Sequence, residues 1–132
     1  MWSGSTIGNN VVAHTGTSLL DHTAEDADMN LTFDYLYDAS LPATDLNNLD
    51  AARVNAWYVG NVVRDFAWKY GFRPLTFNFQ ADTLQDKWAR GDDPVPIRVQ
   101  TTPGVNDAVF TTPPDGSAGV LKLYVWNKAN PT

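Results

Sequence analysis

The stretch that decides the fold is residues 44–71, which read TDLNNLDAARVNAWYVGNVVRDFAWKYG. Large apolar side chains recur about once per helical turn, at Leu46, Leu49, Val54, Trp57, Val62, Phe66 and Tyr70. Three residues are candidate N-caps: Thr44, Asp45 and Asn47. Gly71 can supply a left-handed C-terminal residue, and Pro74 prevents the helix from resuming. The pattern predicts a helix of about 25 residues, and its apolar residues lie on more than one side, so we expect it between two layers.

Two strands are predicted before this helix. Residues 7–15 contain Val11, Val12 and Thr15, a mix that suits a pleated surface. Residues 31–37 alternate between apolar and mostly polar side chains, which predicts a second strand with one buried face. The segment between the two is predicted to be a surface loop.

Shorter elements are predicted directly after the helix. Residues 75–80 alternate and predict a short strand, and a brief helix is predicted around Trp88. Pro94 and Pro96 flank the start of a further strand at residues 97–101. Because proline cannot donate a ladder hydrogen bond, we expect that strand at an edge of the sheet.

The last two apolar runs, residues 105–111 and 120–126, are separated by a Pro-Pro-Asp-Gly turn and predict an antiparallel hairpin. Together the elements predict an α+β fold in a single domain, residues 1–132. We expect a mainly antiparallel sheet of about five strands, with one long and one short helix packed on it.

Composition excludes several classes of protein. The chain has 132 residues, no cysteine, and nine Lys and Arg against fifteen Asp and Glu, which gives a net charge of −6. This is the wrong sign for a protein that gains affinity by neutralising phosphates, so we expect no nucleic-acid partner. No apolar run approaches the roughly 20 residues of a membrane-spanning helix, so we expect no membrane insertion. Thiolate catalysis and a disulfide framework are excluded by the absence of cysteine.

The sequence offers no set of catalytic or metal-ligating residues. A catalytic zinc site usually takes three ligands from histidine and carboxylate side chains, often as H-E-x-x-H on one helix. The two histidines, His14 and His22, are separated by a glycine and a loop, and the sole glutamate, Glu25, belongs to no such motif. We therefore predict no catalytic residue, no metal and no cofactor in this chain.

Trp88 is the candidate for a ligand-binding aromatic residue. It stands among Arg90, Asp92 and Asp93, and an amphipathic ring beside hydrogen-bonding side chains suits the apolar face and the hydroxyls of a sugar. These four residues form a candidate glycan-binding site. The alternatives are that Trp88 packs under the Pro94 loop and that the adjacent aspartates form a turn.

Several short motifs, taken in order, resemble one known family. Arg64-Asp65 stands where that family has a His-Asp pair in a long helix, and Tyr70-Gly71-Phe72 matches the close of that helix. Asn78-Phe79-Gln80 matches the Asn-Phe-Gln that follows. Residues 106–116, NDAVFTTPPDG, resemble Asn-Asn-Ala-Asn-Phe, a small residue, then Thr-Pro-Pro-Asp-Gly. The chain thus resembles the first half of the catalytic domain of the fungalysins, secreted fungal zinc metalloproteases of the M36 family.

The resemblance implies which parts of such a domain this chain carries. In that family the H-E-x-x-H helix and the third zinc ligand lie downstream of a Tyr-x-Trp strand, so no zinc ligand or catalytic glutamate is assigned here. The stretch at Asn106, Asp107 and Ala108 matches the edge strand on which such proteases lay the substrate backbone. Because an exposed edge invites pairing, we expect a homodimer through this edge or through the face on which the other half-domain packs.

Our leading hypothesis is a non-catalytic, secreted fungal glycan-binding protein. It would be a dimeric lectin with a defence or toxicity role that binds glycans or glycoproteins outside the cell, and these residues contain no signal peptide. The alternative is an inert fragment or split half of a fungalysin-like zinc metalloprotease. A weaker alternative is a protease-inhibitor-like module that occupies a related enzyme with its edge strand.

Overall fold

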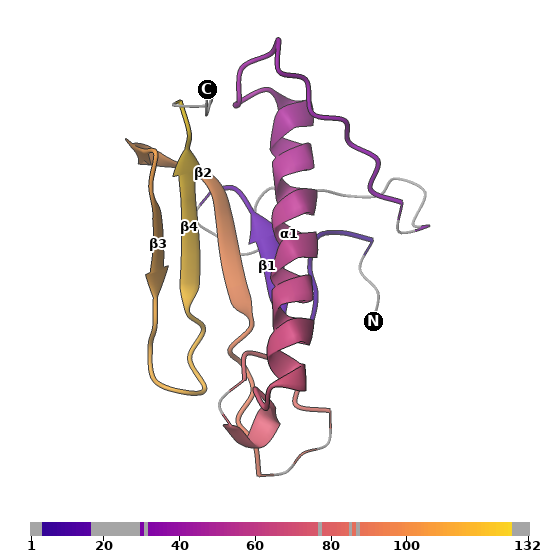
Figure 1. Cartoon of the computed structure of the whole chain (residues 1–132), viewed down its shortest axis with the longest axis vertical. Coiled ribbons are helices and arrows are strands. Elements are labelled where there is room, and N and C mark those ends of the chain that lie inside the picture. Colours follow the sequence, from indigo (N-terminus) through magenta and orange to yellow (C-terminus); the bar gives the residue numbers. More distant parts are fainter. Residues whose placement is uncertain are drawn as a thin grey trace.

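The protein folds as a mixed β-sheet with one long helix on one of its faces (Figure 1). The computed structural model describes residues 4–16, 30, 32–76, 78–84, 86 and 88–127. The elements, in chain order, are β1 (Val11–His14), α1 (Leu46–Lys69), a short 3₁₀ helix η1 (Pro74–Thr76), β2 (Val95–Val105), β3 (Ala108–Thr111) and β4 (Val120–Val125).

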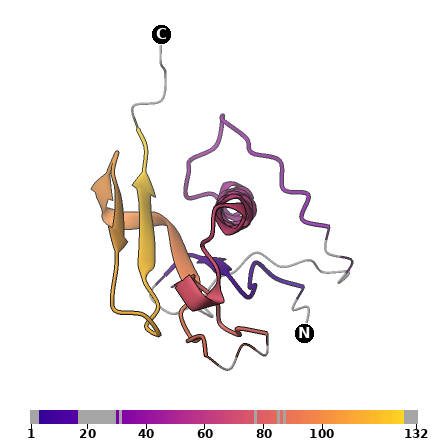
Figure 2. The same ribbon diagram turned by 60° about the horizontal axis from the view of Figure 1, so that its bottom comes forward.

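The sheet has the strand order β1-β2-β4-β3. β1 and β2 are parallel, with Val11 opposite Val95, and β2 and β4 are also parallel. The β3–β4 ladder is antiparallel, with Ala108 opposite Leu123. Figure 2 looks nearly along α1 and shows it over the β1–β2 side of the sheet, with β3 and β4 extending away from it.

The predicted sheet of about five mainly antiparallel strands carrying two helices is therefore wrong. The hairpin predicted from residues 105–111 and 120–126 is confirmed by β3 and β4. The error arises because β4 also inserts between β3 and β2, and two strands that enter the sheet in the same direction pair in parallel. Local alternation identifies a strand, but it does not identify the neighbour on the strand's other side.

β2 is central in the sheet, which corrects the prediction of an edge strand at residues 97–101. It pairs with β1 on one side and with β4 on the other. The pairing with β4 begins at Ile97, after Pro96, so the missing N–H of Pro96 removes no bond from that ladder. Further along, the register with β4 shifts between Arg98 and Thr101 and again before Val105.

Three further predicted elements are absent from the described residues. The strand predicted at 31–37 does not form in residues 32–37, and Leu31 lies outside the described residues. Phe33 instead packs on α1, with its ring centroid 6.0 Å from that of Trp57, while Tyr37 is exposed. The strand predicted at 75–80 is replaced by η1 and irregular chain, with residue 77 not described.

The brief helix predicted around Trp88 also does not form in the described residues. Asp82 Oδ1 accepts a hydrogen bond from the Leu84 N–H at 2.8 Å, and Asp86 Oδ1 accepts one from the Trp88 N–H at 3.2 Å. Such side-chain bonds to the backbone two residues on compete with helical bonds and stabilise turns.

The long helix is confirmed as α1, and its ends are set by local residues. Asp45 is the N-cap, and its carboxylate accepts a hydrogen bond from the Asn47 N–H at 3.0 Å. At the other end Gly71 has a φ of +101°, in the left-handed region that glycine adopts at helix ends. No helix among the described residues is long and apolar enough to cross a membrane.

The segment before α1 is anchored by the buried side chain of Asn48. Its Oδ1 accepts a hydrogen bond from the Asp38 N–H at 2.8 Å, and its Nδ2 donates to the carbonyls of Asp38 and Pro42 at 2.9 and 3.1 Å. The hydroxyl and the N–H of Ser40 both donate to the Asp38 carboxylate, and they hold the pKa of that carboxyl below its ordinary value.

Among the described residues, the sheet packs on one side of α1. Val11, Ala13, Ala56, Ile97 and Val99 form the buried core between α1, β1 and β2. The approach is close at Gly60, where a Cβ atom would lie 3.0 Å from side-chain atoms of both Val11 and Ile97. Other large apolar residues of α1 are exposed: Val59 and Val63 face a groove between α1 and the sheet, whereas Val62 and Phe66 lie outside that groove. The helix was expected between two layers; in the described structure one layer, the sheet, packs on it.

Candidate functional site

β3 forms an open edge of the sheet. It is the last strand in the order, and no further strand pairs with it in the part of the chain that the structure describes. Its four residues are uncharged and all are exposed, including Val109 at 42% and Phe110 at 41%. An exposed strand without charged residues is able to pair with another extended chain.

The turn that leads into β3 is fixed by a pair of side-chain amides. Asn106 has a φ of 54°, in the left-handed region that asparagine tolerates better than most residues. Its Nδ2 donates to Asn127 Oδ1 at 2.6 Å, and the Asn127 N–H donates to Asn106 Oδ1 at 2.9 Å. The Asn106 N–H also donates to the Val125 carbonyl at 2.9 Å. These bonds tie the beginning of β3 to the end of β4.

The backbone of β3 faces β4 and the open edge in turn. The Tyr124 N–H donates to the Asp107 carbonyl at 3.1 Å, so the backbone of Asp107 faces β4. Successive residues of an antiparallel strand face opposite sides, which places the N–H and C=O groups of Ala108 and Phe110 on the open edge. The Ala108 N–H donates to Asp107 Oδ1 at 2.8 Å. Of the three predicted edge residues, Ala108 therefore begins the open edge, whereas Asn106 and Asp107 precede β3 and are joined to β4 by backbone hydrogen bonds.

An apolar groove of about 680 Å³ lies between α1 and the sheet. Small and branched side chains of α1 line one wall: Ala52, Ala56, Val59, Gly60, Val63 and Ala67. Branched side chains of β2 and β4 line the other: Val95, Ile97, Val99, Leu121, Leu123 and Val125. The groove was not predicted from the sequence, although the apolar residues on more than one side of the helix indicated that it had a further packing surface.

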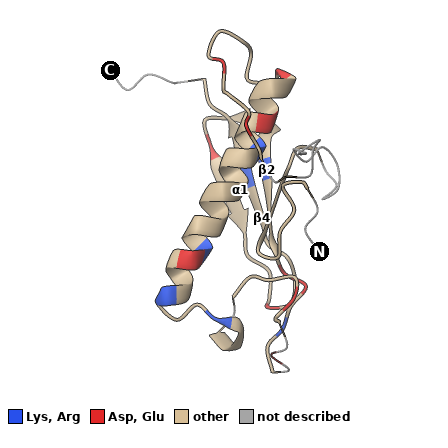
Figure 3. Cartoon of the chain, turned by 90° about the vertical axis from the view of Figure 1, so that its right-hand side faces the viewer, with Lys and Arg blue, Asp and Glu red and all other residues tan. Residues whose placement is uncertain are grey.

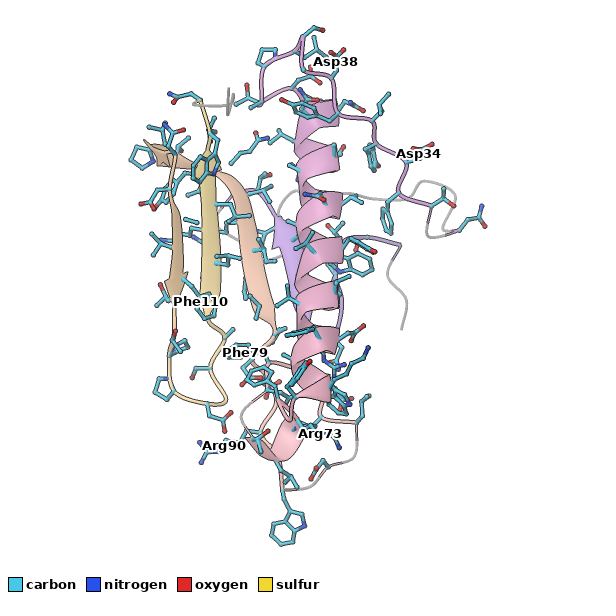
Figure 4. The ribbon with its side chains drawn as sticks, viewed as in Figure 1. Asp34, Asp38, Arg73, Phe79, Arg90 and Phe110 are labelled. Carbon is cyan, nitrogen blue, oxygen red and sulfur yellow. The ribbon has the colours of Figure 1, made fainter. Side chains whose placement is uncertain are left out.

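Aromatic rings connect the groove to β3. Phe72 and Phe79 both line the groove, and their ring centroids are 5.4 Å apart. The Phe79 ring also contacts that of Phe110 on β3, with a centroid distance of 6.0 Å (Figure 4). A ligand on the edge and a partner in the groove would thus contact one continuous aromatic cluster, formed by Phe72, Phe79 and Phe110.

Arg64 carries the only formal charge among the described residues that line the groove. Its guanidinium lies 4.4 Å from the centroid of the Trp68 ring, and Nη1 lies 3.2 Å from Asp65 Oδ1. Figure 3 shows basic residues toward the C-terminal end of α1, where cations are favoured by the helix dipole.

The four residues predicted to bind a glycan have different surroundings. Trp88 is 90% exposed, whereas Asp93 is 1% exposed. The carboxylate of Asp93 accepts hydrogen bonds from the Gln80 N–H at 3.0 Å and the Gly116 N–H at 3.2 Å, so it holds two loops together. Arg90 contacts Asp115, with Nε 3.9 Å from Oδ2, and Asp92 is exposed with a φ of 65°. Among the described residues, no hydrogen bond or ion pair joins two of the four.

The described residues do not provide a metal site. No group of three or more His, Asp or Glu side chains comes together among them in a way that could hold a metal ion. His14 is fully buried, and its Nδ1 lies 3.4 Å from the Thr15 carbonyl oxygen. His22 and Glu25 lie outside the described residues.

Comparison with known proteins places the chain among peptidases. The sequence model of the fungalysin metallopeptidase (M36) family matches residues 2–132. Extracellular metalloproteinase 10 of Uncinocarpus reesii is 34% identical over 96% of this chain, and extracellular metalloproteinase 1 of Arthroderma otae is 33% identical over the same share. The chain spans about a fifth of the length of these relatives, 20% in both cases. The prediction of a glycan-binding lectin is wrong, because the matched proteins are metalloproteinases.

Proposed function

The chain belongs to the fungalysin metallopeptidase (M36) family, and we propose that it is the sheet-bearing part of an extracellular peptidase of this kind. In this role it holds the backbone of a peptide substrate along β3 and packs its groove against the rest of the domain. The extracellular location is supported by the names of the relatives. The remaining four-fifths of a relative's length leaves room for the catalytic groups.

The observation that carries the proposal is the open edge of β3. Its outward-facing N–H and C=O groups belong to Ala108 and Phe110, which have one residue between them, the spacing that a peptide backbone needs to add as a further strand. The Ala108 N–H is bonded to Asp107 Oδ1, which a peptide carbonyl would displace. The Asn106–Asn127 amide pair holds the start of this edge in place. Backbone pairing binds many sequences, as a peptidase requires, and side-chain contacts then set preference.

The groove supports the second half of the proposal. Its walls are the side chains of a helix and the face of a sheet, so neither wall offers a row of free backbone hydrogen-bonding groups. A segment that fills it must satisfy its own backbone polar groups, and an α-helix with an apolar face does so. We propose that this helix comes from the part of the peptidase domain that these residues do not include.

The described residues do not fit the metal that the family name implies. The described part of the chain holds no cluster of ligands for it, and no step of a reaction is assigned to the chain. Its contribution to hydrolysis is to position the peptide, whereas the metal and the groups that act on the bond belong to the rest of the domain. That the chain alone is not an enzyme stays a prediction.

N-methylated peptides test the edge-binding proposal. The N–H groups of an extended heptapeptide of small apolar residues point alternately to its two edges. Two versions are made, each methylated on the amides of one edge. We expect one version to lose binding to the chain by about tenfold, since it lacks the N–H groups that meet β3, and the other to bind like the parent peptide. Fluorescence anisotropy of labelled peptides measures both. Equal affinities for the two versions would contradict strand addition.

Homodimerisation through the same edge stays a prediction. Two copies that paired along β3 would compete with a peptide for Ala108 and Phe110. Light scattering at micromolar concentration tests it, and a mass equal to that of the 14.6 kDa chain would contradict a dimer.

A further inference from the structure

We propose that Asp107 gives the β3 edge a preference for peptides that carry a positive charge. This inference rests on the proposed function, because it assumes that a peptide lies along β3. Asp107 directly precedes the open strand β3, and its side chain accepts a hydrogen bond from the backbone that a peptide must approach.

The position of the carboxylate follows from two hydrogen bonds. The Asp107 carbonyl accepts a bond from the Tyr124 N–H, so the main chain of Asp107 is joined to β4. The Ala108 N–H faces the open edge, and Asp107 Oδ1 accepts its hydrogen bond at 2.8 Å. The first edge N–H that an incoming strand would use is therefore already occupied, and its acceptor is a carboxylate that lies on the path of that strand.

This contact has opposite consequences for different peptides. A peptide carbonyl that approaches the Ala108 N–H must displace the carboxylate. The partial negative charge of its oxygen is also repelled by the negative carboxylate. A Lys or Arg side chain beside the same position is attracted by that carboxylate. Because Asp107 is exposed, screening by water limits the effect, and an exposed ion pair of this kind changes affinity by up to about fivefold.

Among the described residues, no cation forms an ion pair with the Asp107 carboxylate. Lys122 on β4 is the cation in register with β3, opposite Val109 and two residues along from Asp107. No ion pair between Lys122 and Asp107 occurs among the described residues, whose ion pairs involve Asp50, Asp65 and Asp115. Among the described residues, the Asp107 carboxylate thus accepts the Ala108 hydrogen bond and forms no ion pair.

The experiment compares two peptides and two matched variants. The peptides are heptapeptides of small apolar residues, identical except for Lys or Glu at the central position, and affinity is measured by anisotropy at low salt. We expect the wild-type chain to bind the Lys peptide about fivefold more tightly than the Glu peptide. In Asp107→Asn the amide oxygen can still accept the Ala108 hydrogen bond while the charge is lost, so the two peptides should bind alike.

Asp34→Asn is the matched control. It makes the same change in net charge at an exposed aspartate on the opposite side of α1 from β3 (Figure 4), and it should keep the fivefold preference. If the preference survives in Asp107→Asn, or disappears equally in Asp34→Asn, the role of Asp107 is overturned while edge binding stands. If neither peptide binds to the wild type or to Asp107→Asn, edge binding fails, and the inference fails with it.

Discussion

Replacing Asp93 with asparagine is expected to lower the free energy of unfolding by about 2 kcal/mol. The carboxylate is buried and accepts two backbone hydrogen bonds, from Gln80 at 3.0 Å and from Gly116 at 3.2 Å. An asparagine side chain has one acceptor oxygen and one NH₂ group. One of the two backbone N–H groups then faces a donor and loses its partner, and either the Gln80 segment or the loop between β3 and β4 loses its bond to residue 93.

Asp92→Asn is the matched control for this prediction. Asp92 is the adjacent residue and is exposed, and its φ of 65° is one that asparagine also adopts. Its replacement should change stability by no more than about 0.5 kcal/mol. Urea unfolding followed by tryptophan fluorescence measures both variants. Similar stability losses in the two would refute the structural role of Asp93 and reopen the question of what that carboxylate does.

The second large effect concerns the groove. Replacing Val63 with aspartate should weaken association with the rest of a fungalysin-type peptidase domain by about a hundredfold, because docking would bury an unpaired charge. Val63 is 59% exposed in this structure and lines the groove, so the isolated chain should fold normally. The probe is the remaining catalytic portion of the Uncinocarpus reesii relative, and titration calorimetry measures the affinity.

Val62→Asp controls for the added charge. Val62 is also an exposed valine of α1, at 48%, but it does not line the groove. The Val62→Asp variant should bind the probe with an affinity within about threefold of the wild-type affinity. Equal weakening in both variants would point to a charge effect rather than docking in the groove. If a second copy of the chain binds the groove instead, and Val63→Asp prevents this, the proposed occupant is wrong.

The long helix and the last hairpin were predictable because their signals are local. Apolar spacing, an N-cap aspartate and Gly71 define α1, and a Pro-Pro-Asp-Gly turn joins β3 to β4. The parallel pairing of β2 with β1 and β4 was not predictable in this way. It depends on which strands meet across long separations in the sequence, and the alternation within each strand is the same for either direction.

The candidate site was predictable only in part. The edge residues Asn106, Asp107 and Ala108 followed from a motif; Ala108 is the first residue of the open strand β3 and the other two precede it, and their role in binding or dimerisation stays a prediction. The set at Trp88, Arg90, Asp92 and Asp93 was proposed from residue types alone. Asp93 is instead buried between two loops, because a short polar side chain in a turn bonds to nearby backbone as readily as to a ligand. The groove was not predicted because it depends on how α1 packs on the sheet.

Peptide cleavage by a reconstituted mixture tests the central claim most directly. The chain is mixed in equal amounts with the remaining catalytic portion of the Uncinocarpus reesii relative, and hydrolysis of a fluorogenic peptide is followed with and without a metal chelator. We predict cleavage by the mixture that the chelator abolishes, and none by either part alone. A mixture no more active than its separate parts would contradict the claim that this chain completes a peptidase domain.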